Sequence, residues 1–138
     1  MSYEFLDHTA DIIVRAIGKD LKEAFAQGAL GFYDVITNIE TIEEKTTQKV
    51  NIESEDLESL LFDWIDQLIY LFDTELFVSN NIQILKLAKN DNDKFELDAE
   101  LRGEEFDKTK HPPEGEVKAM TYSFMKISDC SVEFTLDL

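Results

Sequence analysis

Residues 55–73 have the sequence EDLESLLFDWIDQLIYLFD and carry the strongest periodic pattern in the chain. The apolar side chains recur every three or four residues and form one stripe: Leu57, Leu60, Leu61, Trp64, Leu68, Leu71 and Phe72. Acidic residues occupy the first turn, where the positive end of the helix dipole stabilises them. The pattern therefore predicts an amphipathic helix whose apolar stripe lies on a sheet.

The segments before this helix predict two strands and a second helix. Residues 11–17 are rich in β-branched side chains and end at Gly18, which predicts a buried strand at the centre of its sheet. Asp20 and Glu23 have the spacing of a helix cap, and apolar residues at helical spacing follow to about residue 37. Residues 46–52 predict a half-exposed strand.

The segments after it predict antiparallel strands. Residues 82–87 are apolar with one slip in their alternation, which indicates a bulge, and residues 95–102 alternate strictly between apolar and charged side chains. A turn at 90–93 joins these strands, and a loop at 103–116, in which we expect His111 to be exposed, precedes strands at about 116–127 and 131–137. This order predicts an α+β fold, a largely antiparallel β-sheet with two packed helices, in one domain over residues 1–138.

Charge and composition limit the possible functions. The chain has 138 residues with 13 Lys and Arg against 30 Asp and Glu, for a formal net charge of −17. Such a negative protein repels phosphate backbones, so we expect no direct nucleic-acid binding and favour metal ions or cationic partners. Cys130 is the only cysteine, and the sequence has no signal pattern and no membrane-spanning apolar run. We therefore expect a cytoplasmic protein with no membrane role.

Acidic residues near the two ends of the chain could bind a cation. Asp7-His8-Thr9-Ala10-Asp11 places two carboxylates and an imidazole just before the buried strand. Asp137 points away from the apolar face of the last strand, and Leu138 adds an α-carboxylate. Simpler interpretations remain open: the first group can be solvated turn residues, and the second can lie on a frayed tail.

Three motifs, in order along almost the whole chain, resemble the archease family. The first is Asp7-His8-Thr9-Ala10-Asp11 with the strand that follows it. The second runs from Gly103-Glu104 to Lys110-His111 and continues as Glu116-Val117-Lys118-Ala119-Met120-Thr121-Tyr122. The third is the ending Leu136-Asp137-Leu138. The resemblance implies a fold of nested strand-helix-strand-strand modules.

The resemblance also implies a divalent-cation site. Its ligands would be Asp11, Asp137 and the free carboxylate of Leu138, with Ca²⁺ as the expected ion and Mg²⁺ or Mn²⁺ also suited to oxygen ligands. Asp7, His8 and Lys118 are further candidates for supporting the ligands or contacting a partner. Ser123 departs from the family pattern, because many members carry histidine at this position, and a role of that histidine is therefore not carried over to this chain.

The implied function is that of a protein cofactor and not of an enzyme. Family members activate a tRNA-splicing RNA ligase by promoting guanylylation of the ligase and multiple turnover in tRNA splicing. One alternative is a metal-dependent phosphohydrolase that uses the same carboxylates, for which His8 and Lys118 would have to act as general base and phosphate clamp. Another is a chaperone-like or nucleic-acid-mimicking acidic module without a metal. The sequence assigns no oligomeric state.

Overall fold

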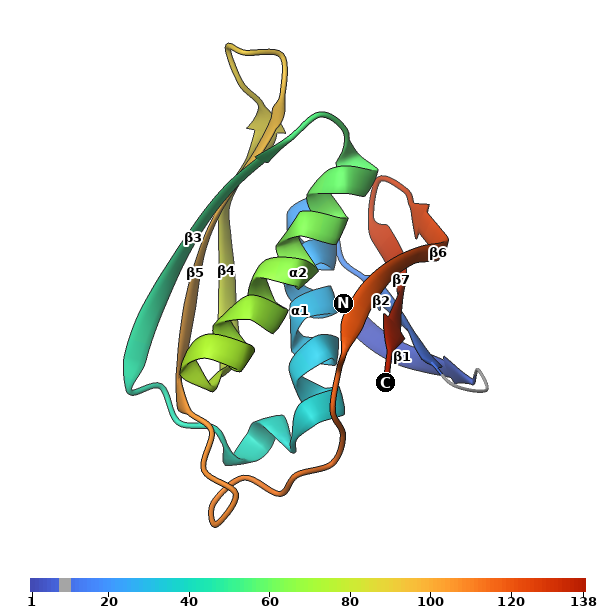
Figure 1. The fold of residues 1–138 in the computed structure, drawn as a ribbon. Coiled ribbons are helices and arrows are strands. Elements are labelled where there is room, and N and C mark those ends of the chain that lie inside the picture. Colours follow the sequence, from blue (N-terminus) through green and yellow to red (C-terminus); the bar gives the residue numbers. More distant parts are fainter. Residues whose placement is uncertain (8–10) are drawn as a thin grey trace.

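The computed structural model describes residues 1–7 and 11–138, which form two long helices and seven strands (Figure 1). In chain order the elements are β1 (Ser2–Asp7), β2 (Asp11–Ile17), α1 (Leu21–Ile36), the short 3₁₀ helix η1 (Ile39–Thr41), β3 (Thr46–Ser54), α2 (Leu57–Glu75), β4 (Phe77–Lys89), β5 (Phe95–Glu105), β6 (Ala119–Ile127) and β7 (Ser131–Asp137). The α+β class predicted from the sequence is confirmed. No helix in the described part of the chain is long and apolar enough to cross a membrane.

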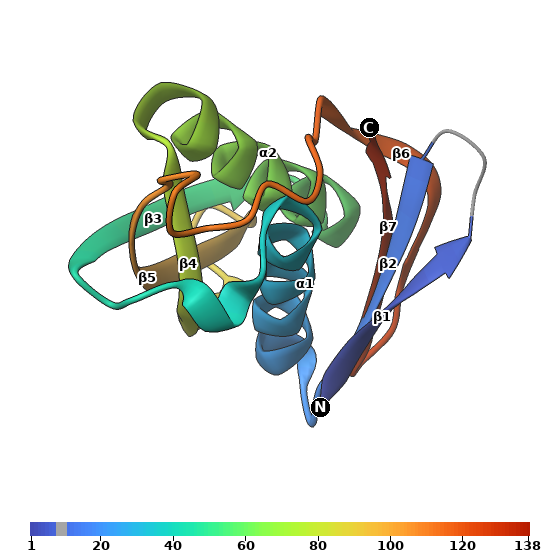
Figure 2. The same cartoon turned by 90° about the horizontal axis from the view of Figure 1, so that it is seen from below.

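The strands form two antiparallel sheets with the helices between them (Figure 2). One sheet has the order β1-β2-β7-β6 and the other the order β3-β5-β4. The unit β3-α2-β4-β5 is thus inserted between α1 and β6 of a second strand-helix-strand-strand unit, β2-α1-β6-β7. This nesting brings the two ends of the chain together in one sheet, with β2 in an interior position as its β-branched sequence predicts.

Both helices begin after a capping aspartate: the cap at Asp20 was predicted, whereas α2 begins at Leu57 and not at residue 55 as expected. The carboxylate of Asp20 accepts a hydrogen bond from the Glu23 amide at 2.9 Å, and that of Asp56 accepts one from the Ser59 amide at 2.7 Å. Each bond satisfies an amide of the first turn that has no partner within the helix. Helix α2 ends at Glu75, beyond which Leu76 adopts a left-handed conformation with φ 54°. The chain then reverses into β4.

The strands differ from the prediction in number and in bounds: β4 begins at Phe77 and β6 at Ala119, where residues 82 and 116 were expected. The register of β4 against β5 shifts between Ile84 and Lys86, which confirms the predicted bulge. The turn between these strands closes through a hydrogen bond from the Asn90 amide to the Lys94 carbonyl at 2.8 Å. Strand β1 was not predicted, yet it pairs with β2 over its full length. Strand β5 also continues to Glu105, so the long loop begins three residues later than expected.

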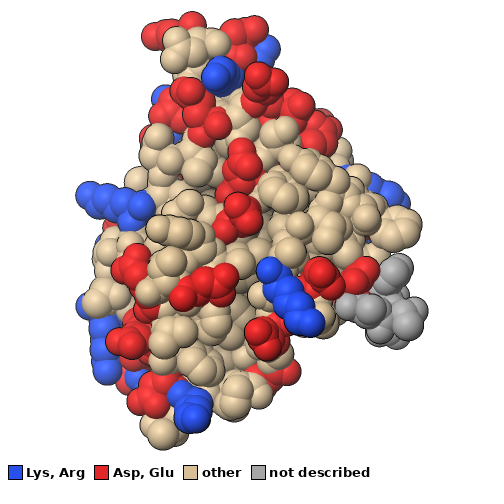
Figure 3. All heavy atoms as spheres, viewed as in Figure 1, with Lys and Arg blue, Asp and Glu red and all other residues tan. Residues whose placement is uncertain are grey.

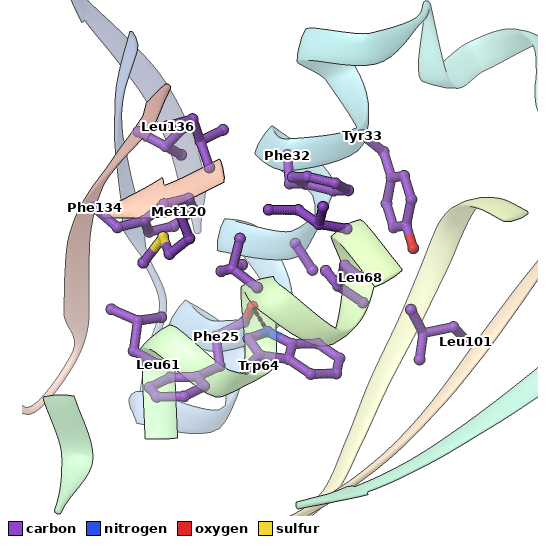
Figure 4. Packing of buried hydrophobic residues seen from close by; sticks show 14 of the residues in the cluster. Phe25, Phe32, Tyr33, Leu61, Trp64, Leu68, Leu101, Met120, Phe134 and Leu136 are labelled. Carbon is purple, nitrogen blue, oxygen red and sulfur yellow. Dashed lines mark hydrogen bonds between the residues drawn. The ribbon is translucent and has the colours of Figure 1, made fainter. Parts of the chain in front are cut away.

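The core lies between the two sheets and is filled mainly by side chains of α1 and α2 (Figure 4). Trp64 of α2 is fully buried, and its indole Nε1 donates a hydrogen bond to the Phe25 carbonyl of α1 at 3.1 Å. This bond satisfies the one polar group of the largest core side chain. Phe134 and Leu136 of β7 complete the core on the side of the four-stranded sheet.

We expect Trp64→Ala to lower the free energy of unfolding by about 3–5 kcal/mol, because it empties a large buried site and leaves a cavity. Tyr70→Ala is a matched control, since Tyr70 lies on the same helix but is 58% exposed. The control should change stability by less than about 1 kcal/mol. Urea unfolding measures both values, and equal losses in the two variants would contradict the assignment of the core.

Candidate metal centre

The candidate site lies at one end of the four-stranded sheet, where Asp11 begins β2 and Asp137 ends β7. These two residues are direct partners in the antiparallel pairing of the strands. Directly opposed residues point to the same face, with Cβ atoms about 4.5–5.5 Å apart. Two carboxylates from opposite ends of the sequence therefore lie side by side on the sheet face that points away from the helices.

An ion-pair network on the same face fixes the register of these strands. Arg15 of β2 faces Glu4 of β1 and Glu133 of β7. Its guanidinium donates to the Glu133 carboxylate at 2.6 Å and to the Glu4 carboxylate at 2.8 Å. Asp11 lies four residues before Arg15 in β2, and Asp137 lies four residues after Glu133 in the antiparallel β7. The register that pairs Arg15 with Glu133 therefore also pairs the two aspartates.

Strand β6 brings Lys118 to the site. Ala119 is the β6 partner of Asp137, and the Lys118 amide donates a hydrogen bond to the Asp137 carbonyl at 2.8 Å. The Lys118 side chain is exposed, and Leu138, which follows the paired residue, is 40% exposed. The structure thus brings together four of the six site residues predicted from the sequence: Asp11, Asp137, Leu138 and Lys118.

The other two predicted residues are placed less completely. Asp7 ends β1 and pairs with Ile12, the residue that follows Asp11. His8 lies outside the described residues. Among the described side chains, no group of three or more His, Cys, Asp or Glu has the arrangement of a metal site. A cation at Asp11 and Asp137 would therefore need further oxygen ligands besides these two carboxylates.

Comparison with known proteins decides the family. Residues 3–138 match the archease protein family. The chain is 44% identical to the protein archease of Pyrococcus furiosus over 125 residues, which are 91% of this chain and 87% of that protein. It is 39% identical to the archease-like protein of Drosophila melanogaster over 127 residues, which are 92% of this chain and 80% of that protein.

The chain belongs to the archease family. Its fold agrees with a solved structure, the solution structure of protein 1598 of Methanobacterium thermoautotrophicum, with a TM-score of 0.86, 35% sequence identity and coverage of 99% of both chains. The family resemblance inferred from the sequence is thereby confirmed.

The second archease motif forms a buried polar cluster around Glu104. The Glu104 carboxylate, 7% exposed, accepts hydrogen bonds from the Glu43 amide at 2.7 Å, from Lys110 Nζ at 2.9 Å and from His111 Nε2 at 2.9 Å. His111 Nδ1 accepts from the Asp107 amide at 2.9 Å, so the proton of the neutral ring lies on Nε2. Our expectation that His111 is an exposed loop residue is therefore wrong: its side chain is fully buried.

Gly103, the first residue of that motif, is required by a close approach of two strands. A Cβ atom at this position would lie 1.8 Å from the Val78 carbonyl oxygen of β4, which no side chain permits. The glycine places Glu104 against the loop that follows β5. Further along this loop, the Glu114 amide donates a hydrogen bond to the Ile36 carbonyl at 2.9 Å. The loop is thus fixed at both ends before it delivers Lys118 to the candidate site.

Burial alone would raise the pKa of Glu104, but the hydrogen bonds from Lys110, the Glu43 amide and His111 outweigh it and lower the pKa from 4.5 to about 2. The unfolded chain therefore takes up the Glu104 proton at higher pH than the folded chain does. Stability from this carboxylate is present above about pH 4.5 and is lost as the pH falls toward about 2.

We expect Glu104→Gln to lower the free energy of unfolding by about 1–3 kcal/mol at neutral pH, because the new amide nitrogen meets buried donors. The difference from the wild type should shrink as the pH falls below about 4.5, where the unfolded-state carboxyl becomes protonated. Urea unfolding at a series of pH values measures this, with Glu105→Gln, at the exposed neighbouring position, as control. A difference that stays constant across the pH range would contradict the role of the carboxylate.

Proposed function

We propose that this archease-family protein is a metal-binding cofactor, without catalytic activity of its own, that activates a tRNA-splicing RNA ligase. It would promote guanylylation of the ligase and so support multiple turnover in tRNA splicing. The observation that carries the proposal is the pairing of Asp11 with Asp137 on the sheet face that points away from the helices. Family membership supports the role of an activating partner.

Asp11, Asp137 and the terminal carboxylate of Leu138 would hold the ion. These are oxygen donors only, which suits Ca²⁺ and also Mg²⁺ or Mn²⁺. The ion would supply a concentrated positive charge that neutralises phosphate oxygens during guanylyl transfer in the ligase. No ligand in this set is a thiolate or an imidazole, so the donors are poorly suited to a structural zinc ion.

The protein's own residues would present the ion and leave part of its coordination open. Two carboxylates on adjacent strands cannot fill the six to eight positions that Ca²⁺ usually takes, so water or oxygen atoms of the partner can complete the set. The strand pairing and the Arg15 ion pairs hold the carboxylates in place before a partner arrives. The exposed Lys118 beside them can pair with a phosphate or a carboxylate of the partner.

We expect Asp11→Asn and Asp137→Asn each to weaken Ca²⁺ or Mn²⁺ binding by at least about tenfold while the fold is kept, because each removes a charged ligand from a half-buried strand end outside the core. Asp91→Asn, an exposed acid in the turn between β4 and β5, is the control and should bind the ion as the wild type does. Calorimetric titration measures all three. Wild-type affinity in both site variants would remove these residues from the metal site.

The contribution of the terminal carboxylate has its own test. A Gly-Ser-Gly extension after Leu138 replaces the charged group by a neutral amide carbonyl, so the extended protein should fold normally but lose cation affinity and stimulation of the ligase. Leu138→Ile keeps the carboxylate and should keep most of both activities. Untagged proteins are required, and an extended form that binds and stimulates as well as the wild type would exclude this ligand.

The proposed function itself is tested by ligase guanylylation. The splicing ligase of the same organism is incubated with labelled GTP and limiting divalent metal, with and without this protein. We expect a faster first guanylylation and repeated turnover in its presence, and no stimulation by Asp137→Asn. An absence of any effect on rate or turnover would contradict the proposal, and metal-dependent hydrolysis of a phosphate ester by the protein alone would favour the phosphohydrolase.

A further inference from the structure

A patch of aromatic and acidic side chains lies where α2 packs against β6. We call it the α2/β6 surface and define it by Phe62, Asp66 and Tyr70 of α2 with Tyr122 of β6. Phe62 and Tyr122 stack with ring centroids 4.4 Å apart and planes tilted by 10°. Tyr122 is 54% exposed and Tyr70 is 58% exposed, although both belong to residue types that usually bury their rings. Clustered aromatic groups of this kind are enriched in protein interfaces.

The helix that supplies most of this surface is acidic. Residues 55–75, which comprise α2 and the two residues before it, contain no Lys or Arg and seven acids: Glu55, Asp56, Glu58, Asp63, Asp66, Asp73 and Glu75. Figure 3 shows acidic side chains following the line of α2 across this face. Asp66 lies within the surface, whereas Asp56, Asp63 and Glu75 accept hydrogen bonds from the Ser59 amide, Ser54 Oγ and Gln48 Nε2. A cationic partner complements the acidic character of α2 better than an acidic or neutral one does.

The part of β6 in this surface has an unusual backbone. Thr121 pairs with Thr135, and Lys126 pairs with Glu133. Residues 122–125 of β6 therefore lie opposite a single residue of β7, Phe134. Within this bulge Phe124 has a φ of 59°, a conformation that bulky residues rarely adopt, and its side chain is 60% exposed. Thr135 Oγ1 donates to the Ser123 carbonyl at 2.7 Å and holds the bulge against the sheet. The exposed aromatic residues are thus presented by a fixed and not a frayed strand.

The α2/β6 surface and the candidate metal centre lie on opposite faces of the four-stranded sheet and meet at β6. Strand β6 begins at Ala119, the partner of Asp137, and reaches Tyr122 three residues later. Figures 1 and 2 agree that α2, the start of β6 and the C-terminus lie on the same face of the molecule. A partner that approaches along the start of β6 can contact both the strand ends that form the metal centre and the α2/β6 surface.

We propose that the α2/β6 surface is the docking surface for the cationic, RNA-handling surface of the ligase. This inference rests on the proposed function, since it takes the ligase as the partner. A protein that binds RNA presents Lys and Arg to the phosphates, and the same side chains can pair with the carboxylates of α2. Arginine can in addition lie over the exposed rings of Tyr70 and Tyr122, because aromatic faces attract cations.

The test uses variants that change this surface and leave the metal centre intact. Asp66→Lys reverses a charge in the middle of the surface, and Tyr122→Ala removes one ring of the stacked pair. Asp91→Lys is a matched control with the same change in net charge on an exposed turn outside the surface. For each protein we would measure affinity for the purified ligase at low and moderate ionic strength, Ca²⁺ affinity by calorimetry, and stability in urea.

We expect Asp66→Lys and Tyr122→Ala each to weaken ligase binding at least tenfold with Ca²⁺ affinity unchanged, and Asp91→Lys to bind the ligase within about twofold of the wild type. Wild-type binding should weaken as salt is added, and less so in Asp66→Lys. Full binding by both surface variants would overturn the inference, as would an equal loss in Asp91→Lys, which would show attraction to net charge alone. A wild-type protein that neither binds nor stimulates the ligase would instead refute the proposed function.

Discussion

The register of β2 against β7 is the constraint on which the site depends. The side-chain period of a strand is two residues, so a slip of one residue would move every outward side chain of β7 to the core. Asp137 would then leave the face that Asp11 occupies. Two features prevent this slip: the apolar side chains Phe134 and Leu136 must face the helices, and Glu133 must meet Arg15. The core and the ion pairs thus select the same register.

The nested topology explains why the site combines both ends of the sequence. The inner unit from β3 to β5 forms its own sheet and supplies half of the core. Its insertion separates Asp11 and Asp137 in sequence without separating them in space. The loop that leaves the inner unit is held by the buried Glu104 and His111 and ends at Lys118. The part of the second family motif from Gly103 to His111 is therefore a structural support for the site and contributes none of the proposed ligands.

Sequence reasoning succeeded where local pattern decides structure. The stripe around Trp64, the capping aspartate Asp20 and the irregular alternation near Leu85 all correspond to features of the fold. It failed for His111, because the burial of this side chain depends on Glu104 and on closure of the loop against Ile36. No local pattern reports such contacts. Strand β1 was missed for a related reason, since its pairing with β2 is what defines it.

The candidate site was only partly predictable from the residues themselves. Each acidic cluster allowed a simpler interpretation, and the family resemblance selected Asp11, Asp137 and Leu138. The pairing of Asp11 with Asp137 is a property of strand register, and register between the first and last strands of a nested fold cannot be read from either segment alone. The α2/β6 surface was hidden for a different reason, because a stripe that predicts a buried helix face says little about what the opposite face binds.

The central claim is that a cation binds between the facing ends of β2 and β7 and not diffusely over the acidic surface. Substoichiometric Mn²⁺ titration followed by amide NMR tests this most directly, because the paramagnetic ion broadens signals of nearby protons first. The account predicts that the amides of Asp11, Lys118, Ala119 and Asp137 broaden before those of α2 and of the turn at 90–94. Earlier broadening along α2 or in that turn, or uniform broadening of all acidic segments, would contradict it.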